Sequence, residues 1–517
     1  MKIGRAAIVA GWLMVAAAAQ AQSVAVRQEV LGNGLRLLLV ERHGAPLVSC
    51  GWTARTGSVD EPPGLTGVSH LLEHLMFKGT RTIGTRDFAS EERLLAEEDR
   101  LQAAMEREYS LLRVRLRRGE ISGDVHDPAN ATPELVQARA QLARLAAEAR
   151  GLVVRDEFDR IYAAEGASDL DAYTTEDQTA YVVTLPANKL ELWFWLESDR
   201  LAAPVFREFE AERAVVLEER RMRTESTPTG LLDEEFDAMF WAGSPYSHPV
   251  VGWPADVASI TREQAAAYFA SHYAAGNVTA VVVGDFVSAG ALDLARRYFG
   301  RLQGGRSAPT EAAMGAPPQR SARRMTAEAE TNPQLTIRFR AVPLGHRDAP
   351  ALQLLADLLD RRAGRLYAAL VEDRKVAVGE PGATFDPLRY DGSFEVTAEV
   401  AEGRSPDDVE RAVLGELARL AGEPVGDREL RRAKNLETAD AVRQLRSGDE
   451  LLHRLLLVDA VDSWRLVNEF PRRVAAVGPG DIRRVTATYL APERRCVAVY
   501  LRRHDAAAAP PAAGGGR

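Results

Sequence analysis

The stretch that decides the fold is residues 67–77, which read GVSHLLEHLMF. As a helix, it places His70 and His74, four residues apart, one above the other on the same face. Two neutral imidazoles in this arrangement can take two corners of a tetrahedral zinc site. Glu73 lies close enough to that face to accept a proton from a metal-bound water as a general base. The alternative is a pair of helix histidines that are satisfied by hydrogen bonds in a core.

A third metal ligand is expected to be an acidic residue on another helix, because a catalytic zinc takes three protein ligands and keeps one open position. Residues 208–223 are predicted to form that helix, and residues 212–219 within it read ERAVVLEE. Glu212 and Glu219 lie two turns apart on one face, beside an aliphatic run set for burial. A buried acidic pair is costly unless it binds something positive. Ordinary surface carboxylates are the alternative, and Glu218 is expected to be solvated.

The 517-residue chain divides at residues 304–333, a linker-like stretch rich in Pro, Ala, Gly and Ser. Each half opens with a strand and then a helix, and closes with a helix and then a strand. We therefore predict an α+β fold made by internal duplication, with domains at residues 22–303 and 334–505. The alternative is that the two halves are alike by chance, because a strand followed by a helix is a common order.

A charged insert at about residues 87–159 interrupts the first half. Two apolar stripes at helical spacing predict an antiparallel helical hairpin. Thr132 followed by Pro133 is typical of the start of its second helix. The charged faces are typical of a solvated surface, and a docking arm for a partner is the alternative.

Both ends of the chain are predicted to lie outside the globular part. Lys2 and Arg5 precede an apolar run that ends in small residues, which predicts a signal peptide at residues 1–21. An uncleaved membrane anchor is the alternative, although the run is short for a membrane span. The protein is therefore expected to be periplasmic or secreted, without a stable membrane anchor. Residues 506–517 are predicted to be a disordered tail.

The composition excludes several classes of protein. The chain has 74 acidic and 65 basic residues and a net charge of −9, so it has no bulk attraction for nucleic acid. Its 46% hydrophobic residues argue against a disordered chain. The two cysteines, Cys50 and Cys496, cannot form a disulfide framework. Both lie in apolar, strand-like runs, where buried free thiols are favoured over a bridge.

Several segments together resemble the pitrilysin/insulinase family of zinc metallopeptidases, the inverzincins, whose signature is H-x-x-E-H. The resemblance covers nearly the whole chain after the leader. It rests on residues 64–80, 212–219, 252–256, 283–285 and 364–367.

The resemblance implies a role for each residue of the candidate site. His70, His74 and Glu219 would bind one Zn²⁺ per chain, and Glu73 would be the catalytic base. Glu212 would orient a ligand histidine through a hydrogen bond.

The resemblance also implies an architecture of two homologous halves closed like a clamshell over an extended peptide. The substrate backbone would pair with a sheet edge in the first half. Asp171, Ala172 and Thr174 fall where the family contacts that backbone, and Asp171 replaces the usual Asn.

Two departures from the family pattern stand out. His74 and Glu219 are 145 residues apart in sequence, longer than usual, and the hairpin accounts for the excess. Val371 and Val378 occupy the positions where many members have an Arg and a Tyr that grip the substrate carbonyl, and neither valine donates a hydrogen bond. Arg365 and Arg374 are candidate replacements, but a related zinc-less partner chain is the favoured source of the missing donors. A homo-oligomer is the alternative assembly.

The function expected from these residues is a zinc-dependent endopeptidase that acts on peptides or unfolded segments by Glu-assisted attack of zinc-bound water. The alternative is a catalytically weak subunit of a heteromeric peptidase, which acts mainly in substrate binding or assembly.

Overall fold

The computed structural model describes residues 23–125, 127–305 and 319–503. The predicted leader, the predicted tail and residues 306–318 of the predicted linker lie outside this part of the chain. In the part that is described, no helix is long and apolar enough to cross a membrane.

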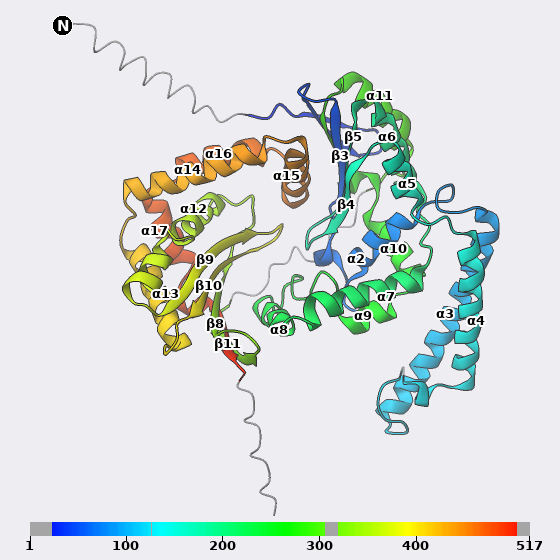
Figure 1. Cartoon of the computed structure of the whole chain (residues 1–517), viewed down its shortest axis with the longest axis horizontal. Coiled ribbons are helices and arrows are strands. Elements are labelled where there is room, and N and C mark those ends of the chain that lie inside the picture. Colours follow the sequence, from blue (N-terminus) through cyan, green and yellow to red (C-terminus); the bar gives the residue numbers. More distant parts are fainter. Residues whose placement is uncertain (1–22, 126, 306–318, 504–517) are drawn as a thin grey trace, which may run out of the picture. The chain divides into compact units, whose positions relative to one another are not determined.

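The described residues of 27–219 and 249–309 form one compact unit, the N-terminal unit, around a six-stranded sheet (Figure 1). Its strands lie in the order β1 (Arg27–Val30), β2 (Arg36–Glu41), β6 (Val278–Gly284), β3 (Leu47–Ala54), β5 (Thr179–Pro186) and β4 (Ser168–Thr174). β2 and β6 are parallel, and the other neighbours are antiparallel. β6 is buried along its whole length, as a strand covered on both faces must be. β4 is an edge strand.

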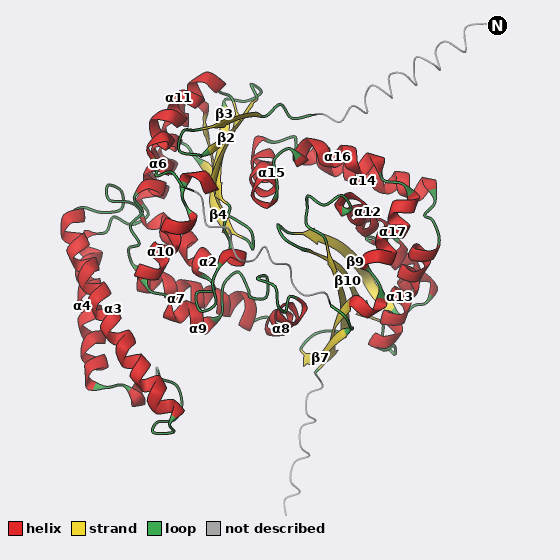
Figure 2. Ribbon diagram, turned by 180° about the vertical axis from the view of Figure 1, so that it is seen from behind, coloured by secondary structure: helices red, strands yellow, loops and turns green. Residues whose placement is uncertain are grey.

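Seven helices of this unit pack around the sheet or beside it. They are α2 (Val68–Leu75), α5 (Glu157–Ala164), α6 (Leu190–Ala202), α7 (Phe209–Arg220), α9 (Pro254–Ser259), α10 (Arg262–His272) and α11 (Ser288–Tyr298). α6 and α11 lie side by side along the sheet (Figure 2). Trp193, Phe194 and Phe299 join them edge to face, with ring centres 4.8–5.4 Å apart. The core they build supports the sheet against which α2 packs.

The other unit, the C-terminal unit, contains the described residues of 1–26, 220–248 and 310–517, around a five-stranded sheet. The strand order is β7 (Arg323–Ala329), β11 (Arg495–Arg502), β8 (Gln334–Ala341), β10 (Gly392–Val400) and β9 (Ala377–Pro387). This order repeats β2, β6, β3, β5 and β4 of the first sheet, including its one parallel pair, here β7 with β11. The repeat confirms the predicted α+β fold with two homologous halves.

The C-terminal unit has a set of helices of its own. They are α8 (Gly230–Phe240), α12 (Ala349–Leu359), a π-helix (Tyr367–Asp373), α13 (Pro406–Gly422), α14 (Asp427–Gln444), α15 (Gly448–Val461), α16 (Leu466–Ala476) and α17 (Pro479–Tyr489). α12 follows β8 as α2 follows β3. β7 lies inside the predicted linker at 304–333, so the linker prediction was too long at its end. β7 was missed because it is an edge strand with exposed residues at every second position and little apolar character.

Residues 220–248 come from the first half of the sequence but pack in the C-terminal unit. The guanidinium of Arg338 on β8 lies over the rings of Phe236 and Phe240, at 4.9 and 5.2 Å from their centres. Tyr500 on β11 donates a hydrogen bond of 2.7 Å to Asp233. Contacts between residues far apart in the sequence therefore place α8 with the second sheet. The predicted domain boundaries remain a prediction.

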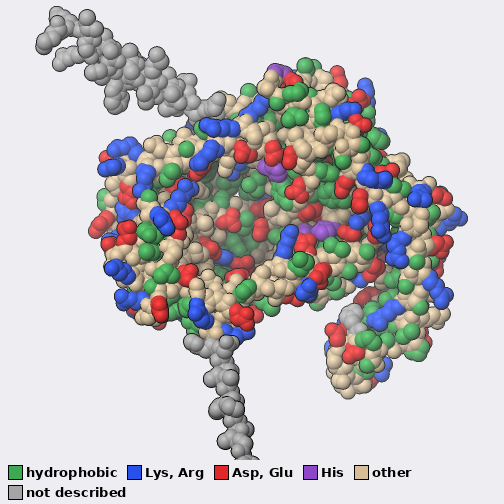
Figure 3. Space-filling view, viewed as in Figure 1, with side chains coloured by type: hydrophobic (Ala, Val, Ile, Leu, Met, Phe, Trp, Pro, Cys, Tyr) green, Lys and Arg blue, Asp and Glu red, His purple; other side chains and the backbone are tan. Residues whose placement is uncertain are grey.

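The insert contains two packed helices, α3 (Phe88–Arg117) and α4 (Pro133–Leu152). The hydroxyl of Thr132 accepts a hydrogen bond from Leu135 N at the start of α4. The hairpin has a small apolar cluster of its own, formed by Met105, Tyr109, Leu112, Val125 and Leu135. Basic and acidic side chains are interspersed over its surface (Figure 3). This surface has the character expected of a solvated face.

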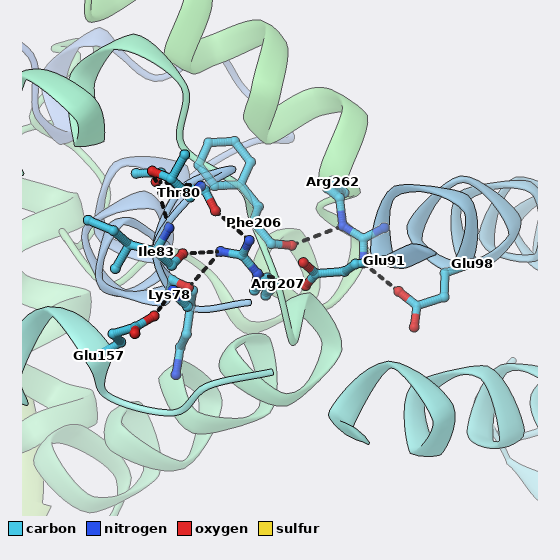
Figure 4. Close-up of polar contacts among 11 residues, drawn as sticks. Lys78, Thr80, Ile83, Glu91, Glu98, Glu157, Phe206, Arg207 and Arg262 are labelled. Atoms are coloured by element: carbon cyan, nitrogen blue, oxygen red, sulfur yellow. Dashed lines mark hydrogen bonds and ion pairs between the residues drawn. The ribbon is translucent and has the colours of Figure 1, made fainter. Parts of the chain in front are cut away.

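Ion pairs fix the root of the hairpin to the rest of the N-terminal unit (Figure 4). Glu91 and Arg207 are each 1% exposed and are joined at 2.6 Å. Arg207 also donates to the carbonyl oxygens of Lys78, Thr80 and Ile83, in the loop after α2. The root is therefore tied to the segment that follows the histidine helix.

The two cysteines are buried free thiols, which confirms the favoured prediction. Burial raises the pKa of Cys50 well above its ordinary value and that of Cys496 to about 11. Both thiols therefore stay protonated at neutral pH and are poor metal ligands.

Candidate metal centre

Helix α2 begins at a position that favours glycine. Gly67 has a φ of 88°, and a Cβ there would lie 2.5 Å from the carbonyl oxygen of Val251. The buried carboxyl group of Glu61, whose pKa burial raises to about 8, accepts hydrogen bonds of 2.7 Å from the N–H groups of Gly67 and Ser69. These bonds satisfy N–H groups that have no acceptor inside the helix. The start of the helix, and with it the placement of the histidines, is thereby fixed.

The structure brings His70 and His74 of α2 together with Glu219 of α7. The imidazole rings are 4.9 Å apart, centre to centre. Nε2 of His70 lies 3.7 Å from Oε1 of Glu219, and Nε2 of His74 lies 3.4 Å from its Oε2. Metal–ligand bonds of about 2.0–2.1 Å at tetrahedral angles separate two ligand atoms by about 3.4 Å, so these residues fit a zinc ion. Across the described ranges, no other group of three His, Cys, Asp or Glu residues converges in this way.

Glu212 lies behind His74, on the side away from Glu219. Its Oε2 is 3.6 Å from Nδ1 of His74, and its Oε1 is 2.5 Å from Nζ of Lys78. Burial raises the pKa of Glu212, but the hydrogen bonds with His74 and Lys78 outweigh burial and hold the pKa below its ordinary value. Burial lowers the pKa of His74, yet Glu212 and the charges of Glu73 and Glu219 together raise it. The imidazole thus has one nitrogen toward each carboxylate, as a histidine oriented for metal binding has.

Glu73 lies between the two histidines in the sequence of α2 and is partly buried. Its Oε2 accepts a hydrogen bond of 2.5 Å from the hydroxyl of Thr174, which is 101 residues away in sequence. Burial raises the pKa of Glu73, while the hydrogen bond from Thr174 and the charge of His74 oppose the rise. A partly buried carboxyl beside candidate metal ligands is suited to accept and return a proton.

The residues predicted to contact substrate lie on β4, the edge strand next to α2. Asp171 is exposed, and its carboxylate accepts a hydrogen bond of 2.9 Å from the N–H of Ala172. The strand pairs with β5 but shifts register between Ser168 and Asp171, near Asp169, which has a φ of 54°. The hydroxyl of Thr174 points to Glu73 rather than away from the site.

Val371 and Val378 lie in the C-terminal unit. Val371 is part of the π-helix, and Val378 is on β9 with 40% of its surface exposed. Arg365, one of the two arginines considered as replacements, is held by Glu429 through two hydrogen bonds of 2.7 and 2.8 Å. The donors of Arg365 are thus largely engaged inside its own unit.

Sequence reasoning identified five of the residues that meet here: His70, Glu73, His74, Glu212 and Glu219. Glu218 is exposed, as expected. The reasoning missed the contact of Thr174 with Glu73, the ion pair of Lys78 with Glu212, and the role of Glu61 at the start of α2. Each depends on a contact that spacing within one helix does not reveal.

Two family models match this chain. The model described as insulinase, peptidase family M16, matches residues 36–130, which include both histidines and Glu73. The model described as peptidase M16 inactive domain matches residues 259–437. The word inactive therefore applies to a segment that contains none of the candidate ligands.

Similar proteins agree with the family models. An uncharacterized zinc protease of Mycobacterium leprae is 25% identical over 445 residues, which cover 84% of this chain and 82% of that protein. A crystal structure of a protease from Helicobacter pylori matches 92% of this chain and 100% of that chain, with a TM-score of 0.73 and 19% identity. The periplasmic protease PqqL from Escherichia coli has a TM-score of 0.66 and 17% identity, covering 92% of this chain and 47% of that chain. Because both solved structures are less than 20% identical to this chain, they show a shared fold and nothing more.

Proposed function

The chain belongs to the pitrilysin/insulinase (M16) family of peptidases, and we propose that it is a zinc-dependent endopeptidase that cleaves peptides or unfolded segments. The observation that carries the proposal is the convergence of His70, His74 and Glu219 on one point, with Glu73 beside them. The name zinc protease of the Mycobacterium leprae relative supports the same activity.

His70, His74 and Glu219 would hold one zinc ion, which when bound supplies a Lewis acid that activates water near neutral pH. Glu73 would take the proton of the attacking water at its carboxylate and return it to the leaving amine. Glu212 would keep the imidazole of His74 in the tautomer that leaves Nε2 free to bind metal.

The substrate would be an extended peptide that adds to the edge strand β4. Backbone pairing with an edge tolerates varied side chains, which suits a peptidase for unfolded segments. Asp171 and Ala172 lie on this edge next to the helix with the histidines, which supports their assignment as substrate contacts. Neither nucleic acid nor a stable membrane anchor has a role in this proposal.

We place the protein in the periplasm or outside the cell. The leader-like residues 1–21 support this location, and so does the fold shared with a periplasmic protease. A related partner chain without zinc, or a second copy, would supply carbonyl-binding donors that Val371 and Val378 lack.

A catalytically weak subunit is the second candidate function. Val371 and Val378 favour it, because neither side chain stabilises an oxyanion. The complete set of Glu73 and three candidate ligands argues against it, since a scaffold has no use for a general base beside a metal.

The test is hydrolysis of an unstructured peptide library by the purified chain, with Glu73→Gln as the inactive form and Glu218→Gln as the matched control. We expect one zinc per chain in all three proteins, measured by metal analysis. Cleavage should fall by about 10²–10⁴-fold in Glu73→Gln and stay unchanged in Glu218→Gln. The experiment is repeated with a homologue that lacks H-x-x-E-H but has the Arg and Tyr. Zinc binding without any cleavage sensitive to Glu73→Gln, alone or with that partner, would show that the peptidase assignment is wrong.

A further inference from the structure

The hydroxyl of Thr174 donates its single proton to the candidate base. The distance from Thr174 Oγ1 to Glu73 Oε2 is 2.5 Å, which is typical of a hydroxyl bound to a carboxylate. A second acceptor, Oγ1 of Thr179, lies at 3.5 Å. The much shorter bond therefore takes the proton, and Thr174 has none left to donate to a substrate backbone.

The position of this hydroxyl is set by the sheet. Thr174 pairs with Thr179 in the β4–β5 register, and this is the last residue pair of the ladder before the two strands turn. Thr179 in turn donates a hydrogen bond of 3.1 Å to the carbonyl oxygen of Thr56. The β-branched side chain of Thr174 has few allowed χ1 rotamers on such a strand, so the strand restricts the orientation of its hydroxyl.

We propose that Thr174 is a positioning residue for Glu73. The hydrogen bond engages Oε2 of Glu73 and fixes the plane of the carboxylate, so that Oε1 is the oxygen that accepts the proton of the attacking water. The assignment rests on the proposed peptidase function and replaces the sequence prediction that Thr174 binds substrate. It also links the substrate edge to the base, because β4 carries both Thr174 and the expected substrate contacts.

The decisive variants are Thr174→Val and Thr174→Ser. Valine keeps the shape and the strand preference but removes the hydroxyl, and serine keeps the hydroxyl. With the full chain and a cleavable peptide, we expect Thr174→Val to lower kcat by about 10–100-fold and to change KM by less than about twofold, because the loss is one of orientation. Thr174→Ser should stay within about threefold of the wild type. A rise in KM with unchanged kcat in Thr174→Val would overturn the proposal in favour of substrate binding.

Action through Glu73 is tested by combining variants. In the Glu73→Gln background, Thr174→Val should cause no further loss of the residual rate beyond about twofold, since the base it positions is gone. The affinity of uncleaved peptide for Glu73→Gln should likewise be unchanged by Thr174→Val, measured by fluorescence anisotropy. Weaker peptide binding in the double variant would refute the positioning role without reference to catalysis.

The two levels of the proposal fail differently. If wild-type protein shows no cleavage that depends on Glu73, the proposed function fails and the positioning role falls with it. If wild-type cleavage depends on Glu73 but Thr174→Val cleaves at the wild-type rate, only the positioning role fails.

Discussion

Removing the carboxylate of Glu91 should loosen the connection between the helical hairpin and the loop after α2. Glu91 and Arg207 are almost fully buried, so Glu91→Ala leaves the guanidinium of Arg207 with a buried charge and no counter-ion. Loss of one partner from such a pair costs about 3–5 kcal/mol. Against a typical total stability of about 5–15 kcal/mol, this is a large local loss.

Two further variants show how much of the loss in Glu91→Ala comes from the buried charge. Glu91→Gln keeps an oxygen that accepts one hydrogen bond from Arg207 but removes the charge, so we expect it to lose less than Glu91→Ala. Glu106→Ala breaks the ion pair between Glu106 and Arg113, two side chains that are 42–43% exposed. Its loss should lower stability by only about 0.2–1 kcal/mol. The control therefore lies on the same hairpin and removes the same type of charge.

Amide hydrogen exchange measured by mass spectrometry suits this test, because two compact units do not guarantee two-state unfolding. Protection should fall in the segment of residues 78–84, where Arg207 binds the carbonyl oxygens of Lys78, Thr80 and Ile83, and in the first turns of α3. The residues of β11 serve as an internal reference. If Glu91→Ala and Glu106→Ala alter exchange in residues 78–84 equally, the buried pair does not hold the root of the hairpin.

Three other outcomes follow from the structure. Glu212→Gln should weaken zinc binding by about 10–100-fold in a competition titration, because it removes the carboxylate behind His74; equal affinity to Glu218→Gln would contradict this role. Glu61→Ala should lower the free energy of local opening at the start of α2 by about 2–4 kcal/mol, measured by amide hydrogen exchange, because two N–H groups lose their acceptor, and Glu61→Gln should lose less; similar losses in the two would be inconsistent with the cap. Burial raises the pKa of Asp357 from 3.8 to about 7, so its contribution to stability is present at low pH and is lost as pH rises between these values. The melting temperature of Asp357→Asn should therefore fall less than that of the wild type between pH 5 and pH 8, and parallel curves would disprove the assignment.

Local spacing explains why so much of the candidate site is readable from sequence. Histidines at i and i+4 share a helix face whatever the rest of the chain does, and Glu212 and Glu219 share one for the same reason. The repeated order of strands and helices likewise predicted two α+β halves. These patterns depend on periodicity within an element, which short segments of sequence contain.

Other features depend on contacts between segments far apart in the chain. α8 reads as part of the first half, but cation–π contacts and hydrogen bonds hold it on the second sheet. β7 carries too few apolar residues to be recognised as a strand, and becomes one by pairing with β11. Strand order also depends on such contacts, since β6 lies between β2 and β3 in the sheet although it follows them by more than 200 residues in the sequence.

The sequence by itself aligned His70 with His74 and Glu212 with Glu219, because helical periodicity places each pair on one helix face, and the family resemblance added Glu73 and the role of each residue. Only the tertiary structure decided which carboxylate oxygen faces which imidazole nitrogen, and that the hydroxyl of Thr174 points to Glu73. The physical reason is that a hydrogen bond needs its atoms placed within a few tenths of an ångström. Packing of α2, α7 and β4 on a common core achieves that placement, and no local pattern encodes it.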